Sequence, residues 1–162
     1  MITLKKITPA DFDTFKSWIT NKEELFQFAG PVFTYPITNQ QLENYLQLKD
    51  IKPFKIILNA SNKTIGHCEF NFKYKVPRLS RILVGDKKMR GKGLGLHIVN
   101  KMVEILFEDP TITKVDLNVF DWNKAAIKCY QNAGFQINTI DTDDLKVGNE
   151  VWKRLNMVLE RK

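Results

Sequence analysis

The stretch Arg90-Gly91-Lys92-Gly93-Leu94-Gly95 separates a strand-like run, Leu79 to Val84, from a helix-like run, Leu96 to Phe107. Glycine has no Cβ, so the backbone N–H groups of such a turn can converge on one point. The helix that follows adds the positive end of its dipole. The stretch therefore predicts a receptor for phosphate oxygens at a strand–turn–helix junction.

A second motif follows further along the chain. Residues 123–130 read N-K-A-A-I-K-C-Y, and Gly134-Phe135 comes shortly after them. Asn123, Ala126 and Tyr130 are spaced i, i+3 and i+7, which places them on one face of a helix. Asn123 also has the character of a helix cap, and Tyr130 could be a core aromatic residue. Both readings stay open beside a binding role.

The net charge of +7 is the main compositional signal. Such a balance fits solvated lysine, nucleic acid, an anionic membrane surface or a cofactor that carries several phosphates. Lys87, Lys88, Arg90 and Lys92 crowd the glycine turn, and no nucleic-acid motif is recognisable. The location of the charge favours a polyphosphate cofactor over DNA or RNA.

Length and composition predict one domain over residues 1–162. No stretch approaches the roughly 20 apolar residues of a membrane span, and the first residues lack the apolar core of a signal peptide. Cys68 and Cys129 give neither a disulfide framework nor a metal-ligand spacing. We expect a cytoplasmic protein without a bound metal.

Hydrophobic periodicity predicts an α+β fold with helices on the faces of a mixed, mostly antiparallel sheet of about seven strands. The expected helices cover residues 9–19, 23–28, 40–48, 93–107 and 123–132. The expected strands cover residues 54–58, 64–72, 79–84, 114–119, 135–140 and 151–159.

The two motifs in this order, and the order of the elements, resemble the GNAT superfamily of N-acetyltransferases. The segment Phe33-Thr34-Tyr35-Pro36 and the helices around it look like the branch of ribosomal-protein N-terminal and spermidine acetyltransferases. The resemblance implies a single-domain GNAT-like fold with acetyl-CoA as cosubstrate. It further implies that Leu83 and Val84 offer backbone groups to the pantetheine arm and that the turn wraps the pyrophosphate. The residues implied in the turn are Arg90, Gly91, Lys92, Gly93, Leu94 and Gly95; those implied beyond it are Asn118, Asn123, Ala126 and Tyr130.

By the same resemblance, Tyr130 is the general acid that protonates the departing CoA thiolate. A phenol with a pKa of about 10 stays protonated at neutral pH and can donate to a thiolate whose conjugate acid has a pKa of about 8.5.

The general base is harder to assign. Some superfamily members carry a glutamate at the position of Asn118, and an asparagine cannot take up the proton. Glu69, inside the apolar run Gly66-His67-Cys68-Glu69-Phe70, is the best candidate base, although an alternating strand could also turn it to solvent. His67 is a secondary candidate, and we expect His97 to be a surface or packing residue.

The leading functional hypothesis is an N-acetyltransferase that moves an acetyl group from acetyl-CoA to a primary amine in a direct ternary complex. The acceptor is a peptide α-amine or a small-molecule amine. An α-amine has a pKa of about 7.8, against about 10.4 for a lysine-like amine, so a larger fraction of it is already neutral at neutral pH and it depends less on a general base. One alternative is a catalytically inactive CoA-binding regulatory module, and another is a basic RNA- or ribosome-associated protein. We expect no membrane or nucleic-acid partner, and the exposed edge of an open sheet makes a homodimer plausible.

Overall fold

The computed structural model describes residues 1–162 and divides the chain into two compact units. The first unit comprises Met1–Lys73 and Ser80–Gly91, and the second comprises Tyr74–Leu79 and Lys92–Lys162. The single domain expected over residues 1–162 stays a prediction. No helix is long and apolar enough to cross a membrane.

One seven-stranded sheet has the strand order β1-β2-β3-β4-β5-β7-β6. Its strands are β1 (Ile2–Lys6), β2 (Ile51–Leu58), β3 (Lys63–Asn71), β4 (Arg78–Val84), β5 (Lys114–Phe120), β6 (Gln136–Val147) and β7 (Glu150–Glu160). Strands β4 and β5 are parallel, whereas β1–β2, β2–β3, β5–β7 and β6–β7 pair antiparallel. The predicted α+β class, with a mixed and mostly antiparallel sheet, is confirmed.

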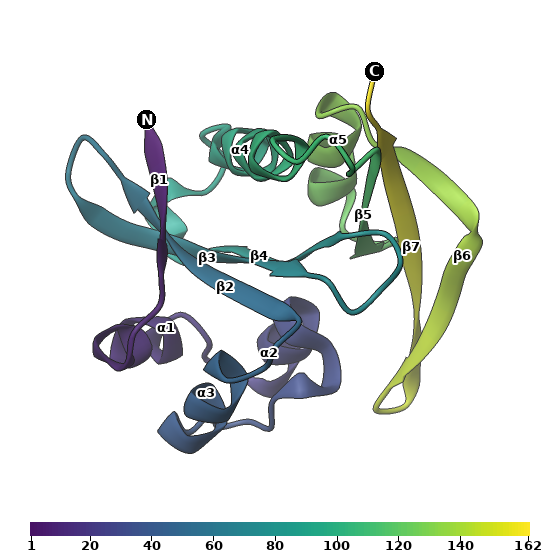
Figure 1. Ribbon diagram of the computed structural model, residues 1–162. Coiled ribbons are helices and arrows are strands. Elements are labelled where there is room, and N and C mark those ends of the chain that lie inside the picture. Colours follow the sequence, from purple (N-terminus) through teal and green to yellow (C-terminus); the bar gives the residue numbers. More distant parts are fainter. The chain divides into compact units, whose positions relative to one another are not determined.

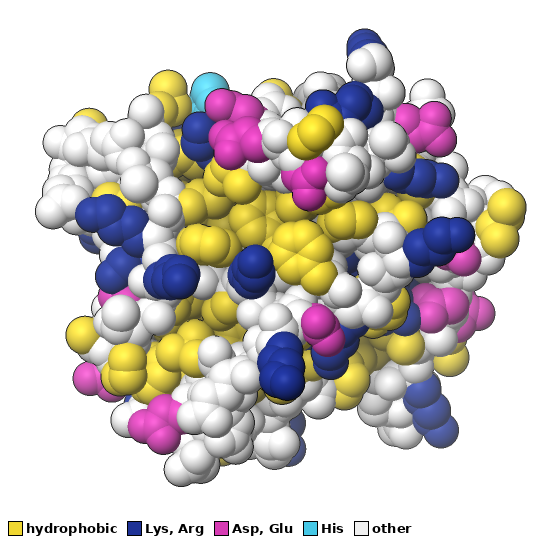
Figure 2. Space-filling model, in the orientation of Figure 1, with side chains coloured by type: hydrophobic (Ala, Val, Ile, Leu, Met, Phe, Trp, Pro, Cys, Tyr) yellow, Lys and Arg dark blue, Asp and Glu magenta, His cyan; other side chains and the backbone are white.

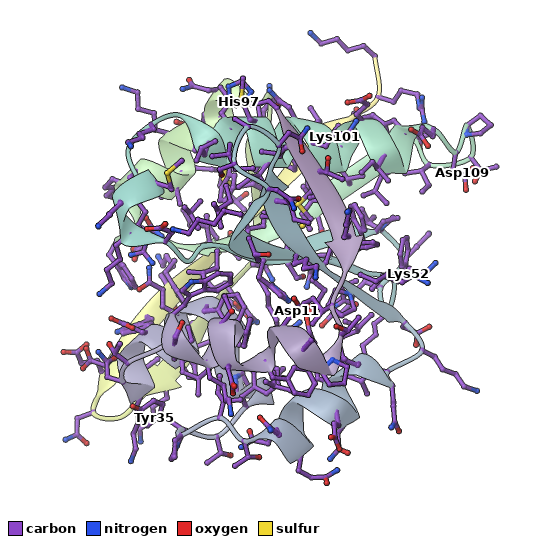
Figure 3. The ribbon with its side chains drawn as sticks, turned by 90° about the vertical axis from the view of Figure 1, so that its left-hand side faces the viewer. Asp11, Tyr35, Lys52, His97, Lys101 and Asp109 are labelled. Carbon is purple, nitrogen blue, oxygen red and sulfur yellow. The ribbon has the colours of Figure 1, made fainter.

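In the first unit, three short α-helices lie on the same side of β2 and β3 (Figure 1). They are α1 (Phe12–Ser17, preceded by the 3-10 turn η1, Pro9–Asp11), α2 (Lys22–Ala29, followed by η2, Gly30–Val32) and α3 (Asn39–Leu46). Their apolar faces form one buried cluster whose members are Phe12, Phe15, Ile19, Leu25, Ala29, Phe33, Ile37, Leu42, Tyr45 and Ile51. The start of α1 is held to the sheet by Asp11, labelled in Figure 3, which pairs with Lys55 of β2 at 2.8 Å.

Side-chain caps fix where α2 and α3 begin. The Oδ1 of Asn21 accepts from Glu24 N at 2.8 Å, and the Oγ1 of Thr38 accepts from Gln41 N at 3.2 Å. Each cap satisfies one of the N–H groups that the first turn of a helix leaves without a partner.

In the second unit, α4 (Leu94–Phe107) lies beside α5 (Lys124–Asn132), and β5, β7 and β6 follow one another in the sheet (Figure 1). The core of this unit includes Ile98, Val99 and Met102 of α4 together with Leu117 and Met157 of the sheet. His97 and Lys101, one turn apart on α4, are not part of this core: His97 is exposed, as expected (Figure 3).

Two elements differ from the sequence prediction. Strand β1 was not predicted; it pairs Ile2 with Leu58 across a long sequence separation and has only part of its surface buried. Strand β6 runs to Val147 rather than ending at Ile140, because an irregularity between Asn138 and Asp143 interrupts its alternation while the pairing with β7 resumes beyond it.

Candidate active site

The glycine turn lies directly before α4. Gly91 and Gly93 have φ angles of +73° and +76°, and a Cβ at either position would meet nothing within 4 Å. Gly93 is the N-cap residue of α4 and brings no capping side chain, so the N–H groups of the first turn have no side-chain partner there. Leu94 is buried as the first residue of the helix and Gly95 follows it in the first turn. The turn is therefore open on its outer side and aims helix N–H groups outward, as a phosphate site requires.

Exposed cations flank the turn along the chain. Lys87, Lys88, Arg90 and Lys92 are all exposed. The Nε of Arg90 donates to the Val84 carbonyl at 2.8 Å, so this arginine fixes the end of β4 while its charge stays near the turn. The positive charge that the sequence predicts next to the glycine turn is therefore exposed on the surface.

A groove of about 410 Å³ lies beside this segment in the first unit, lined in part by Gly85 and by Trp18, the residue that follows α1. A Cβ at Gly85 would stand only 2.0 Å from the Trp18 ring, so no side chain fits there. Gly85 N donates to Ile65 O of β3 at 2.8 Å. Trp18 and strand β3 therefore both contact the chain just after β4.

Strand β4 pairs with β5 only through Arg78 and Leu79, yet it continues as a strand to Val84. Arg81, in its middle, has a φ of +48°, a conformation that is uncommon for a residue with a side chain. Leu83 and Val84, predicted to offer backbone groups to pantetheine, are partly buried at the end of this strand. The carbonyl of Val84 accepts from Arg90.

The carboxylate of Glu69 lies in a buried polar network of the first unit. Its side chain is 0% exposed, which contradicts the solvent-facing alternative. The Tyr45 hydroxyl donates to Oε2 and the Arg81 Nη1 donates to Oε1 at 2.5 Å. Burial raises the pKa of Glu69, against the opposing effects of Arg81 and Tyr45. Tyr45 and Arg81, from α3 and β4, were not predicted, because no local pattern marks a partner on a distant element.

His67 and Cys68 are neighbours on β3, and both are buried. The Nδ1 of His67 lies 2.7 Å from the carbonyl of Arg81, and the ring packs edge-on against Phe15 and Phe28. Burial lowers the pKa of His67 to about 4, so the ring is neutral at neutral pH and donates its Nδ1 proton to that carbonyl. Cys68 is fully buried, and burial raises the pKa of its thiol to about 12, which disfavours the thiolate that an acyl carrier would need.

Helix α5 carries the second motif. Asn123 is its N-cap and accepts from Ala126 N at 3.2 Å, so the capping role is confirmed. Tyr130 is half-buried, contacts the Phe135 ring at 6.4 Å, and makes no hydrogen bond through its hydroxyl. Burial raises the pKa of Tyr130, which keeps the phenol protonated at neutral pH. This is the state that a general acid needs before it acts.

Asn118 lies in a polar network of the second unit. Asn156 Nδ2 is 2.9 Å from the side-chain amide of Asn118 and 3.1 Å from Asp116 Oδ2. Asp116 in turn accepts from Arg78 through two hydrogen bonds of 2.9 and 3.0 Å. Asn118 therefore links β5 to β7 through Asn156. Nothing in the sequence pattern indicated that Asn156 or Arg78 belongs to this network. No group of three or more acidic, histidine or cysteine side chains is arranged to hold a metal ion.

Comparison with known proteins gives consistent matches. A model of the acetyltransferase (GNAT) domain family matches residues 1–136. The aminoglycoside N(6')-acetyltransferase type 1 of Klebsiella pneumoniae is 28% identical over 159 residues, which cover 88% of this chain and 78% of that protein.

Two solved structures have the same fold. The spermidine N-acetyltransferase of Vibrio cholerae, in complex with CoA and spermine, has a TM-score of 0.81 at 16% identity and covers 99% of this chain and 95% of its own. The aminoglycoside acetyltransferase AAC(6')-Ib, in complex with coenzyme A, has a TM-score of 0.76 at 23% identity, with coverages of 99% and 95%.

Proposed function

The chain belongs to the acetyltransferase (GNAT) domain family and is an acetyl-CoA-dependent N-acetyltransferase, and we propose that its acceptor is a primary amine of a small cationic molecule. The names of its relatives support this acceptor class, since both aminoglycosides and spermidine are small molecules with several amines. A peptide α-amine, also expected from the sequence, is the second candidate. The observation that carries the reaction itself is the glycine turn at the start of α4.

We propose that this turn holds the pyrophosphate of the cosubstrate. The residues present fit such a group: Gly91 and Gly93 leave the backbone open, α4 adds its dipole, and Lys92 and Arg90 add positive charge. Asn123 and Ala126, at the start of α5, are proposed as further contacts. Acetyl-CoA supplies an activated acyl group and a thiolate leaving group.

Tyr130 is the proposed general acid. As the acceptor nitrogen forms its bond to the acyl carbon and the C–S bond breaks, the Tyr130 hydroxyl donates its proton to the departing sulfur. The raised pKa of this phenol keeps the proton available over the neutral range. Burial of Cys68 supports attack by the amine itself, without an acyl-enzyme intermediate.

Glu69 remains the predicted base. Its hydrogen-bond partners determine by which path a proton from the acceptor could reach its carboxylate. Both carboxylate oxygens accept hydrogen bonds, from Tyr45 and from Arg81. The Arg81 guanidinium stays protonated, so of these two groups only the Tyr45 hydroxyl can pass an acceptor proton to the carboxylate. If the Glu69 carboxylate only holds Arg81 in place, no proton has to be transferred to it.

The test of the function compares Gly93→Asp with Gly93→Asn. Asparagine and aspartate both tolerate the left-handed backbone found at Gly93, so both variants should fold, but only aspartate sets a negative charge against the phosphates. With acetyl-CoA at about 100 times its Kd, the wild type gains about 2.7 kcal/mol, or about 5–10 °C in melting temperature. We expect the Asn variant to keep most of this shift and the Asp variant to lose it.

Release of CoA thiol is then measured over a panel of diamines, monoamines and peptides with a free α-amine. Turnover of diamines supports the proposed acceptor, whereas turnover of peptides alone would replace it by the α-amine. Absence of any melting shift in the wild type would refute the assignment of the turn.

For the assembly we propose a homodimer and a cytoplasmic location. Ile140 of the edge strand β6 is 90% exposed and Val151 of β7 is 67% exposed, an apolar pair that a second copy would cover. Both cysteines are free thiols, which fits a reducing compartment. Light scattering behind a sizing column tests the dimer. In Figure 2, lysine and arginine side chains are interspersed with acidic and apolar ones.

A further inference from the structure

One face of the β5–β7–β6 sheet carries an aromatic cluster whose position follows from strand alternation. Leu159 of β7 faces α5, because a Cβ at Gly134, just after that helix, would stand 3.1 Å from its Cδ1. Leu155 and Met157 share this face with Leu159, since alternate residues of a strand lie on one face.

The opposite face therefore presents Trp152, Arg154 and Asn156 of β7. Residues directly opposite on paired strands share a face, and the register pairs Asn118 with Asn156 and Phe120 with Arg154. The aromatic and polar side chains of these strands thus gather on the face away from α5.

The aromatic cluster consists of Phe120, Trp122 and Trp152. The rings of Phe120 and Trp122 are nearly parallel, with centroids 6.0 Å apart. Trp152 stands edge-on to both, at 4.9 Å from Phe120 and 5.3 Å from Trp122. Phe120 is buried, whereas Trp122 remains 44% exposed. The cluster is thus a rigid platform with an accessible indole surface.

A carboxylate is fixed beside this platform. The Trp152 Nε1–H donates to Oε2 of Glu150 at 3.1 Å, which holds the acid next to the rings. Asp143, on the same face, is neutralised by Arg154 at 2.6 Å. Glu150 has no such partner, since no lysine or arginine lies within 4.0 Å of it. The negative charge of Glu150 is therefore available to a ligand.

An indole face together with an unpaired carboxylate is the chemistry that recognises an organic ammonium ion, because the ring quadrupole and the charge both attract a cation. We propose that Trp122, Trp152 and Glu150 bind a protonated amine of the acceptor, and this assignment rests on the proposed function. The reacting amine must be neutral in order to attack, so the bound ammonium is a second nitrogen of the same molecule. The acceptor is accordingly a diamine or polyamine. Trp122 directly precedes Asn123, the N-cap of the helix that carries Tyr130.

The test uses 1,4-diaminobutane and 1-aminobutane, which differ by the second amino group. Binding of each is measured by calorimetry in the presence of free CoA, and KM and kcat are measured with acetyl-CoA. We expect Trp122→Ala and Glu150→Gln each to raise the Kd and KM for the diamine by about 2- to 30-fold, the range of a cation–π contact. The constants for 1-aminobutane and for acetyl-CoA should stay unchanged.

A matched control comes from the same strand. Glu160→Gln removes an exposed carboxylate at the far end of β7 and should behave as wild type. Trp122→Phe keeps an aromatic surface and should lie between wild type and Trp122→Ala, which separates loss of binding from loss of folding.

Equal diamine affinity in wild type, Trp122→Ala and Glu150→Gln would overturn the assignment while leaving the acetyltransferase function intact. Diamine binding that these variants weaken, without turnover of any amine by the wild type, would support the cation site and refute the proposed acceptor. Equal affinity of the wild type for the diamine and the monoamine would also overturn the assignment.

Discussion

Replacing Glu69 by glutamine is the perturbation whose effect the structure defines best. The substitution keeps the shape of the side chain and removes its charge. Arg81, whose side chain is only 12% exposed, then loses its counter-ion while its Nε is already buried without a hydrogen-bond partner. Breaking a buried ion pair by removing one partner costs about 3–5 kcal/mol. At about 2–4 °C per kcal/mol for a chain of this size, the melting temperature should fall by about 6–20 °C.

Thermal unfolding followed by circular dichroism at pH 7.5 measures this loss. The matched control is Glu104→Gln, which makes the same chemical change in the exposed Glu104–Lys101 pair of α4. A surface pair contributes less than about 1 kcal/mol, so this control should melt within about 4 °C of the wild type. Because the pKa of Glu69 is raised in the folded protein, its carboxyl becomes neutral at a higher pH than an ordinary glutamate. The folded wild type therefore binds this proton at a higher pH than the unfolded chain does, so the stability difference between wild type and Glu69→Gln should grow as the pH falls.

The same variant decides between the two roles of Glu69. A general base contributes about 10²- to 10⁴-fold to the rate, so loss of a base would lower kcat by this factor and abolish the acidic limb of the pH–rate profile. A carboxylate that only holds Arg81 leaves kcat, measured well below the melting point, within about tenfold of wild type. A melting temperature within 2 °C of wild type would refute the ion-pair reasoning. A 10²-fold loss of kcat with the acidic limb abolished would establish the base.

Three further predictions follow from single side chains. Tyr130→Phe should lower kcat by about 10²-fold or more with little change in the KM for acetyl-CoA, and an unchanged kcat in steady-state assays would remove Tyr130 as the acid. His67 has a folded pKa of about 4 against an ordinary 6.5, so the unfolded chain takes up a proton first as the pH falls. His67 should therefore cost about 3 kcal/mol of stability between pH 6.5 and 4, and an imidazole NMR signal that titrates above pH 6 would contradict this. Cys68, buried with a raised pKa, should resist thiol reagents in the native state, and Cys68→Ala should retain turnover; complete inactivation would revive a covalent route.

Local patterns predicted most of the elements, because caps and apolar periodicity are properties of short segments. Asn123 caps a helix, which is one of the roles that its motif predicted. The glycine turn was also predictable, since its geometry depends on residues that are adjacent in the chain. Strand β1 was not, because its pairing partner lies some fifty positions away and its lysines weaken the alternation.

The contacts that define the site were less accessible to sequence reasoning. Glu69 could be recognised as an acid in an apolar strand, but its partners come from α3 and from β4. Trp122 and Trp152 meet only because β5 pairs with β7. Long-range pairing decides such contacts, and a single sequence carries no local sign of it.

Because Trp18 packs against Gly85, the residues that are tolerated at position 85 depend on the residue at position 18. A methyl group at residue 85 cannot be accommodated while an indole stands 2.0 Å from its place, so any lineage that enlarges residue 85 must first shrink residue 18. A saturation library of Gly85 alone should thus yield almost no folded members. A library that also varies Trp18 opens a path to new sequences, and its survivors would have a reshaped groove beside the glycine turn.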